Sequence, residues 1–255
     1  MSNTWTICKK EINTYFTSPI AYVVTAVFLI LVGFFFYNLV SWFSSQAIRL
    51  SQNPYYFQYL NINQMVYSPL FNNISIILLL MIPILTMRLF SEEQKIKTDE
   101  LLLTSPISVS QIILGKYLSA LFMLIVMLVL SGILSIFCFT YGNPELAPIL
   151  NGYLGLFLMG AAFIAAGIFF SSLTENQIVA AASTFGVLLL FWILNWAASS
   201  AGGAWKDILN YTAFFQHFDN MTQGILDTTD IVYYLSLSFL GLFLTHSVIQ
   251  SRRWR

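Results

Sequence analysis

The chain has 255 residues, of which 58% are hydrophobic and only 9% are charged, and its formal net charge is zero. An ordinary soluble domain carries about 25% charged residues, so this composition excludes most soluble folds and indicates an integral membrane protein. The neutral balance also argues against a nucleic-acid partner. The two cysteines form neither a CxxC pair nor a cluster with histidine, so we expect no disulfide and no metal site.

The first periodic segment lies close to the amino terminus. Its apolar residues recur at three- and four-residue steps: Trp5, Cys8, Ile12, Tyr15 and Phe16. Polar side chains lie between them, which favours an amphipathic helix in the membrane interface, ended at Ser18-Pro19. A frayed tail is the alternative that the sequence leaves open.

Six stretches without Asp, Glu, Lys or Arg follow along the chain. Each can hold the roughly 20 apolar residues that a helix needs to cross the hydrocarbon. Their apolar cores, with a few flanking residues, predict six transmembrane helices, at residues 20–42, 70–89, 112–139, 153–173, 177–198 and 230–250. The strands of a β-barrel would alternate and run for about ten residues. The predicted fold is therefore an all-α polytopic membrane protein, with a single transmembrane domain over residues 1–255.

The distribution of basic residues predicts the orientation of these helices. One side receives nine Lys and Arg residues: Lys9, Lys10, Arg88, Lys95, Lys97, Lys116, Arg252, Arg253 and Arg255. The other side receives two, Arg49 and Lys206. By the positive-inside rule both termini and residues 91–108 are cytoplasmic, while residues 43–69, 140–152 and 199–229 are outside.

Two further segments have a character of their own. The outer segment between spans five and six is too apolar for a solvated loop, which predicts short re-entrant helices; its apolar residues are Ile208, Phe214, Phe215, Phe218, Met221 and Ile225. Span four carries small residues four apart, Ala161/Ala165 and Ala162/Ala166, which allow close helix packing, either inside the bundle or against another subunit.

Signatures of catalysis are absent from the sequence. It contains no HExxH, no GxSxG and no phosphate-binding GxxxxGK[ST]. His217 and His246 are better explained as packed or interfacial residues than as catalysts. The spans also lack the buried charges typical of an ion-coupled pump. We therefore expect a chain that is not itself an enzyme and binds no cofactor.

The inner loop SEEQKIKTDELLLTSPIS, residues 91–108, is the most charge-dense stretch of the chain. Thr98 can cap a short helix, with Asp99 and Glu100 complementing the dipole in its first turn. Leu101, Leu102 and Leu103 would give that helix an apolar surface, and Ser105-Pro106 would end it. Ser108 and Gln111 then form a capping box for span three, with Ile107 and Ile112 as a hydrophobic staple. These features favour a cytoplasmic docking helix; an ordinary folded loop is the alternative.

Three segments resemble a known family. LFSEEQKIKTDELLLTSPISVSQIILGKYLSAL (89–121) is similar to the stretch after the second span of type-2 ABC exporter permeases. KKEINTYFTSPIAYVV (9–24) is similar to the amino-terminal segment of that family, and residues 217–254 to its closing section. The resemblance covers nearly the whole chain and is greatest to the gliding-motility-associated permease subunit. Lys97 departs from the family pattern, because Gly often holds that position.

The resemblance implies a six-span permease subunit in a bacterial cytoplasmic (inner) membrane. Its inner loop would be a coupling helix that contacts a separate ATPase subunit. ATP and Mg would be bound by that separate ABC-type ATPase subunit, and the permease would pair with itself or with a homologous permease subunit. In the gliding-related branch, a membrane subunit with a large outer domain is a further expected partner. The expected coupling residues are Glu92, Glu93, Thr98, Asp99, Glu100, Leu101, Leu102, Thr104 and Pro106. The alternative function is a non-transporting, ATP-driven membrane scaffold that transmits force to outer-side partners.

Overall fold

A computed structural model describes residues 3–50, 61–98, 107–141, 144–200 and 213–253. Over these ranges the chain is helical apart from short connections and contains no β-strand, which confirms the predicted all-α fold class. Six helical segments in the described part of the chain are long and apolar enough to cross a membrane. The chain is therefore a multi-pass membrane protein.

Ten helical elements follow one another along the described residues. They are α1 (Asn3–Thr17), α2 (Pro19–Leu50), the π-helix η1 (Asn63–Tyr67), α4 (Ser68–Thr86), α5 (Arg88–Lys95), α7 (Val109–Tyr141), α8 (Leu146–Leu173), α9 (Gln177–Ser200), α11 (Phe214–Thr222) and α12 (Thr228–Arg253). The spanning helices are α2, α4 with its neighbours, α7, α8, α9 and α12.

All six predicted spans are present, and they differ from the prediction mainly at their ends. The helix predicted at 20–42 continues to Leu50, and the helix predicted to begin at 153 begins at Leu146. The second span is composite, because η1, α4 and α5 follow one another across it. Pro83 lies within α4 and cannot donate a backbone hydrogen bond there. An apolar core therefore marks each span well, but flanking polar residues can extend the same helix.

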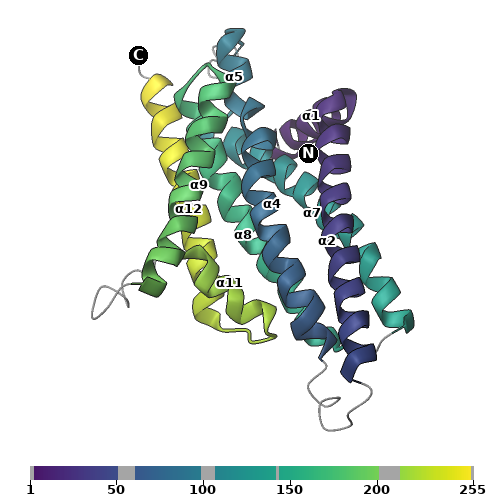
Figure 1. Cartoon of the computed structure of the whole chain (residues 1–255). Coiled ribbons are helices and arrows are strands. Elements are labelled where there is room, and N and C mark those ends of the chain that lie inside the picture. The colour runs from purple at the N-terminus through teal and green to yellow at the C-terminus, as the bar shows by residue number, and fades with distance from the viewer. Residues whose placement is uncertain (1–2, 51–60, 99–106, 142–143, 201–212, 254–255) are drawn as a thin grey trace.

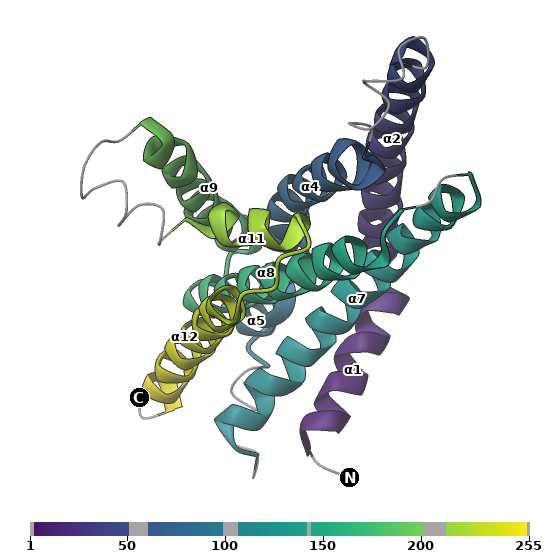
Figure 2. The same ribbon diagram turned by 90° about the horizontal axis from the view of Figure 1, so that it is seen from below.

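The helices form a bundle in which both termini and α5 lie at one end, while α11 lies at the other (Figure 1). Viewed along the bundle, α8 occupies the middle (Figure 2). It packs against α4, α5, α7, α9, α11 and α12. The helices α2, α9 and α12 bury only about a fifth or less of their apolar segments inside this chain, as expected for surfaces that meet lipid or another membrane subunit.

Glycines explain how α8 can contact so many neighbours. A Cβ atom at Gly152 would lie 2.2 Å from the ring of Phe71, and one at Gly167 would lie 2.1 Å from Thr86 Oγ1. Both partners belong to α4, so this helix approaches the α8 backbone along much of its length. Ala161 and Ala165 are buried in the same helix. The small residues of α8 thus serve packing inside this chain, one of the two interpretations that the sequence allowed.

The amino-terminal helix is present and ends at Thr17, as predicted. It lies across the end of the bundle (Figure 2). The side chains that α1 buries against the bundle are those of Ile7, Cys8, Glu11 and Tyr15, whereas Trp5 and Phe16 are exposed. Aromatic side chains on the exposed face can meet lipid. The buried face contains Glu11, whose carboxylate pairs with Lys116 of α7. Its place in the membrane interface stays a prediction.

A short helix also occurs between spans five and six, where the sequence predicted one. In α11 the side chains of Phe214, Phe215, Phe218 and Met221 are buried, and the last two pack over Gly155 of α8. Ile225 is 57% exposed, so it does not share that packing. Ile208 lies outside the described residues. How deeply α11 sits in the bilayer stays a prediction.

Candidate functional site

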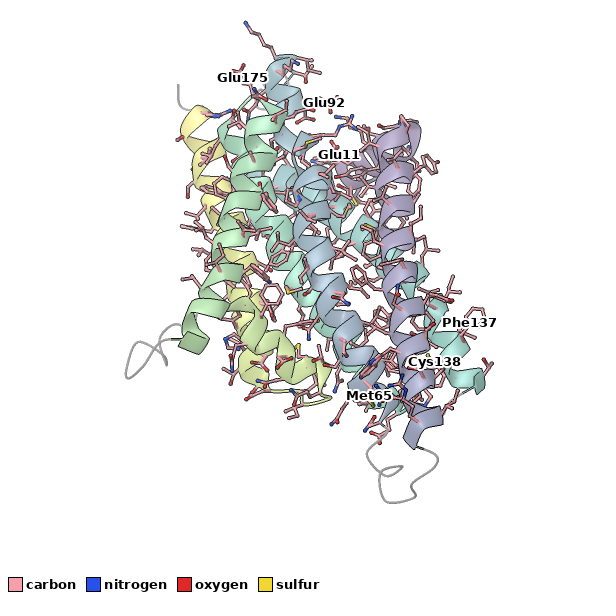
Figure 3. The ribbon with its side chains drawn as sticks, in the orientation of Figure 1. Glu11, Met65, Glu92, Phe137, Cys138 and Glu175 are labelled. Atoms are coloured by element: carbon pink, nitrogen blue, oxygen red, sulfur yellow. The ribbon has the colours of Figure 1, made fainter. Side chains whose placement is uncertain are left out.

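A cluster of charged side chains lies where α1, α5 and α7 meet, at the end of the bundle that holds both termini. At its centre is Lys116 of α7, whose side chain is only 1% exposed. Its Nζ atom lies 3.0 Å from Glu11 Oε1 of α1 and 3.0 Å from Glu93 Oε2 of α5. One buried ammonium group therefore joins three elements; Figure 3 shows Glu11 at this end.

The periodicity of α7 places this lysine on the inner face of the helix. Ile112, Ile113 and Ala120 are buried at steps of three and four residues from Lys116. Burial of an unpaired ammonium group is very costly, but here two carboxylates and an aromatic ring surround it. The Nζ atom lies 5.1 Å from the centroid of the Phe90 ring, within range of a cation–π interaction.

Further charges extend the cluster toward the solvent. Lys10 is 61% exposed and donates to Glu93 Oε1 at 3.3 Å. Arg88 forms an ion pair of 3.0 Å with Glu92, one helical turn away, and donates to Ser18 Oγ at 3.0 Å. We call these residues together the ionic cluster: Lys10, Glu11, Arg88, Glu92, Glu93 and Lys116. It contains three cations and three anions, so its charges balance.

Tyr15 ties α1 to the second span beside the ionic cluster. Its hydroxyl donates to the backbone carbonyl of Leu85 at 3.1 Å. Complete burial, reinforced by the nearby Glu11 carboxylate, raises the pKa of this hydroxyl far above its ordinary value, so Tyr15 remains a neutral donor. Burial likewise raises the pKa of the Cys8 thiol on the same helix, which keeps it unreactive.

The inner loop leaves α5 through a Schellman turn. The amide of Thr98 donates to the carbonyl of Glu93 at 3.0 Å, and the amide of Lys97 donates to that of Gln94 at 3.2 Å. Lys97 has φ 58°, in the left-handed region that favours glycine. A lysine therefore adopts a conformation that suits glycine, at the position where the resembled family often has Gly.

The loop re-enters the bundle through the predicted capping box. The Gln111 amide donates to Ser108 Oγ at 3.3 Å, and the Ser108 amide donates to Gln111 Oε1 at the same distance. This reciprocal pair confirms the start of α7. Ile107 and Ile112, the predicted staple, both belong to the core at this point.

Among the predicted coupling residues, the structure describes three. Glu93 faces inward to Lys116, Glu92 is 41% exposed and paired with Arg88, and the Thr98 hydroxyl donates to the Glu93 carbonyl at 3.4 Å. The remaining ones lie outside the described residues: Asp99, Glu100, Leu101, Leu102, Thr104 and Pro106. The coupling role of all nine therefore stays a prediction.

A polar cavity of about 280 Å³ adjoins the ionic cluster. Its wall includes all six members of the cluster together with Thr14 and Thr98. The root of the inner loop thus borders a charged hollow beneath α1. Side chains there have room to exchange partners, which a dry hydrophobic core would not allow.

The sequence pointed to Glu93 but missed its partners. The expectation that the spans lack buried charge was wrong for two of them, since Lys116 of α7 and Asp230 of α12 are both buried. Both lie near helix ends, directly before the uncharged stretches 117–144 and 231–251. The spacing of residues could have predicted the burial of Lys116, because it lies three or four residues from apolar positions of α7 that face the core.

A second polar contact lies at the opposite end of the bundle. Nδ1 of His217 in α11 lies 2.6 Å from Oδ1 of Asp230 in α12, and the ring of Tyr233 stacks on the imidazole with centroids 4.1 Å apart. His217 is buried in this contact, in keeping with the packed residue expected from the sequence. It joins α11 to the first turn of α12.

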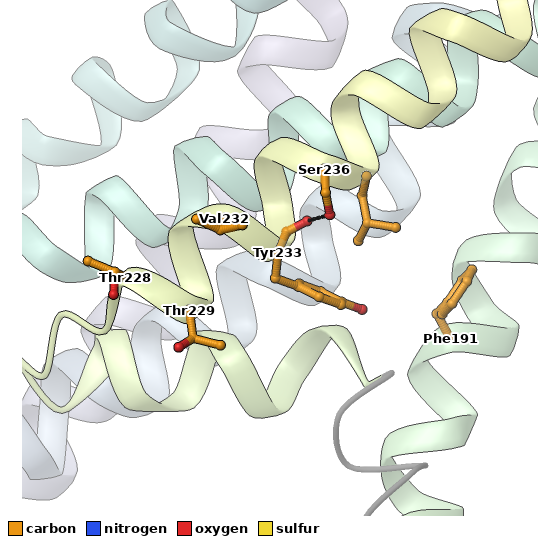
Figure 4. Close-up of a pocket in the computed structure, with 7 residues that line it drawn as sticks. Phe191, Thr228, Thr229, Val232, Tyr233 and Ser236 are labelled. Atoms are coloured by element: carbon orange, nitrogen blue, oxygen red, sulfur yellow. Dashed lines mark hydrogen bonds between the residues drawn. The ribbon is translucent and has the colours of Figure 1, made fainter.

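A groove of about 650 Å³ lies beside this contact, between α9 and α12. Seven of the described residues line it: Phe191, Thr228, Thr229, Val232, Tyr233, Ser236 and Leu237 (Figure 4). One wall is a single face of α12, and Phe191 of α9 stands opposite. The groove shares no residue with the ionic cluster.

The structure is that of a polytopic membrane protein with the ionic cluster at one end of its bundle, next to both ends of the inner loop. The ABC-2 family transporter protein model matches residues 5–249, so the chain belongs to that family. It is thus a membrane permease subunit of an ABC transporter, a class that works with an ABC ATPase subunit and does not itself carry the ATPase motifs. No curated protein matches the chain.

Proposed function

We propose that this permease subunit receives ATP-driven movement through residues 98–106 and passes it to the bundle through the ionic cluster. The observation that carries the proposal is that both ends of the inner loop are anchored. The Schellman turn fixes its start to α5, the capping box fixes its end to α7, and Lys116 joins these two helices to α1. A push on the loop would therefore reach three elements together.

The orientation of the chain is part of this proposal. Nine basic residues against two favour a cytoplasmic location for both termini and for the loop. The cytoplasmic side is where a soluble ATPase subunit binds its ATP and Mg, and this chain would bind neither. The subunit would work as a pair, with a second copy or a homologous permease, and export an unidentified substrate.

The resemblance of residues 9–24, 89–121 and 217–254 supports a narrower assignment to the gliding-motility-related branch. In that branch a membrane subunit with a large outer domain is the expected additional partner. Purification of the tagged chain from its native membranes, followed by mass spectrometry, tests this assignment. Recovery of an ABC ATPase together with such a subunit is expected; recovery of the ATPase without it would contradict the narrower assignment alone.

Replacing Leu101 and Leu102 by aspartate tests the docking role of the loop. If these side chains are buried against the ATPase, two charges there would cost several kcal/mol of association, so the ATPase should be lost from a pull-down. Thr98→Ala should be milder, because loss of a helix cap costs about 1 kcal/mol. Expression and membrane insertion should stay normal, since the spans are unchanged.

A matched control exists at the other end of the bundle. Ile225 and Leu226 are also adjacent and are 57% and 48% exposed, so replacing both by aspartate adds the same charges far from the loop. The control should keep the ATPase. Retention of the ATPase by both double variants would mean that residues 98–106 do not form the docking surface.

A further inference from the structure

The backbone ladder of the second span is interrupted between α4 and α5, and a side chain from another helix takes over its hydrogen bonds. Ser171 of α8 accepts hydrogen bonds from the amides of Phe90 and Ser91, at 3.1 and 3.2 Å. Its own hydroxyl proton is donated to the carbonyl of Met87 at 2.9 Å. An uninterrupted helix would satisfy the Ser91 amide and the Met87 carbonyl with each other.

The Ser171 hydroxyl is fully used at this break. A hydroxyl can donate one hydrogen bond and accept two, and Ser171 makes all three with backbone groups of the second span. Ser171 and Ser91 are both 0% exposed, so water cannot readily replace a lost partner. The Ser91 hydroxyl donates to the Met87 carbonyl as well. One side chain of α8 therefore holds the end of α4 and the start of α5 together.

The second span touches α8 without a gap immediately before the break. Thr86 is 0% exposed and fits against Gly167, where a Cβ atom would overlap its hydroxyl. This contact and the Ser171 hydrogen bonds lie one turn apart on α8. Together they fix the base of α5 at one point of the central helix.

The other end of α5 is held to α8 less completely, while Glu93 pairs it with Lys116 of α7. The side-chain amide of Gln94 donates to the carbonyl of Ser172 at 3.0 Å, one of the last carbonyls of α8. Gln94 is only 6% exposed, and its buried Oε1 atom has no hydrogen-bond partner among the residues that the structure describes. A buried acceptor without a partner is costly, so this end gains if it can move to a donor. The hydrogen bonds between α5 and α8 are thus complete at the base of α5, near Ser91, but not at its tip, at Gln94.

We propose that the break between α4 and α5 is a hinge, with Ser171 as its positioning residue and the Gln94 end as its moving end. The inner loop is attached to that moving end. The hinge rests on the proposed coupling function for its role, because it would convert a push on the loop into a tilt of α5 against α8. The hinge itself is formed entirely by residues of this chain and does not require the ATPase.

Hydrogen exchange of the purified chain in lipid nanodiscs tests the hinge without any partner. Ser171→Ala removes all three bonds and should speed exchange of the Phe90 and Ser91 amides about tenfold or more, with little change elsewhere in the bundle. Ser172→Ala is the matched control, since within the described residues its hydroxyl donates to the Phe169 carbonyl of its own helix and to no group of the second span. Equal exchange in the two variants, or faster exchange throughout the bundle in the first, would overturn the hinge.

A second variant separates the base from the tip. Gln94→Met keeps the length of the side chain but removes its bond to the Ser172 carbonyl. It should raise exchange near the end of α5 and leave the Phe90 and Ser91 amides protected. Equal acceleration at both places would mean that α5 loosens from α8 as a whole, which contradicts a hinge at its base. This variant also serves if Ser171→Ala fails to fold.

Spin labels at Lys95→Cys and Glu175→Cys report the movement itself, because both side chains are exposed at the ends of α5 and α8. In the complex with the ATPase, addition of a non-hydrolysable ATP analogue should shift the distance between the labels. If the ATPase remains bound but the distance between the labels does not change, the hinge is overturned and the docking function is left intact. Loss of the ATPase from the Leu101/Leu102 variant tests that function separately.

Discussion

Lys116→Met replaces a buried ammonium group by an apolar side chain of similar length. The substitution leaves the carboxylates of Glu11 and Glu93 without their common partner, and their side chains are only 11% and 13% exposed. Lys10 still reaches both carboxylates, at 3.8 and 3.3 Å, but it is 61% exposed and can offset little of the loss. Removal of one partner from a buried pair costs about 3–5 kcal/mol.

Thermal unfolding in detergent measures this loss. For a chain of this size, 1 kcal/mol corresponds to a shift in Tm of about 2–4 °C, so the variant should unfold about 6–20 °C lower. The triple variant Lys116→Met, Glu11→Gln, Glu93→Gln removes the unpaired charges as well. It should recover most of the lost stability, because an apolar or neutral replacement of a whole buried pair is often tolerated.

The comparison of single and triple variants decides what the cluster contributes. A wild-type Tm for Lys116→Met would refute the reasoning, since it would mean that the two carboxylates do not depend on the lysine. If the triple variant is as unstable as the single one, the loss comes from packing against Phe90 and not from unpaired charge. A double-mutant cycle between Lys116 and each carboxylate then apportions the coupling.

Lys97→Gly should raise stability by about 1 kcal/mol, seen as a higher Tm, because glycine adopts the left-handed conformation without steric cost; Lys95→Gly, inside α5, should lower it by a similar amount. The same result for both would contradict the turn geometry. Thiol labelling of intact cells should modify Gln223→Cys but not Lys95→Cys, since the two exposed positions are expected on opposite sides; the native Cys8 and Cys138 are buried and should stay silent. The reverse pattern would overturn the orientation.

Transmembrane helices are predictable here because lipid imposes one strong condition on them. A charge at mid-depth costs about 2.5–3.5 kcal/mol, so uncharged gaps map directly onto spans. Local rules served equally well at the ends of the inner loop. Ser108 and Gln111 cap α7 as expected, and the chain turns from α1 into α2 at Ser18-Pro19.

The ionic cluster needed tertiary information that spacing alone does not carry. The sequence shows that Lys116 can face inward but not that Glu11, 105 residues earlier, meets it. The burial of Glu11 in α1 has the same cause, since its carboxylate pairs with Lys116 of another helix. The break at Met87 also depends on Ser171, 84 residues away, which no local pattern announces.

The glycine-lined surface of α8 has a consequence for how the protein is made. Ribosomes release the spans in chain order, so α2, α4 and α7 enter the membrane before α8 exists. Phe71 and Thr86 of α4, and Leu124 of α7, must then wait for the backbone of Gly152, Gly160 and Gly167 before they reach their final contacts. The first three spans thus form an incomplete assembly, and the fourth span converts it into a packed one. A chain that stops after α7 should be recognised by membrane quality control and degraded.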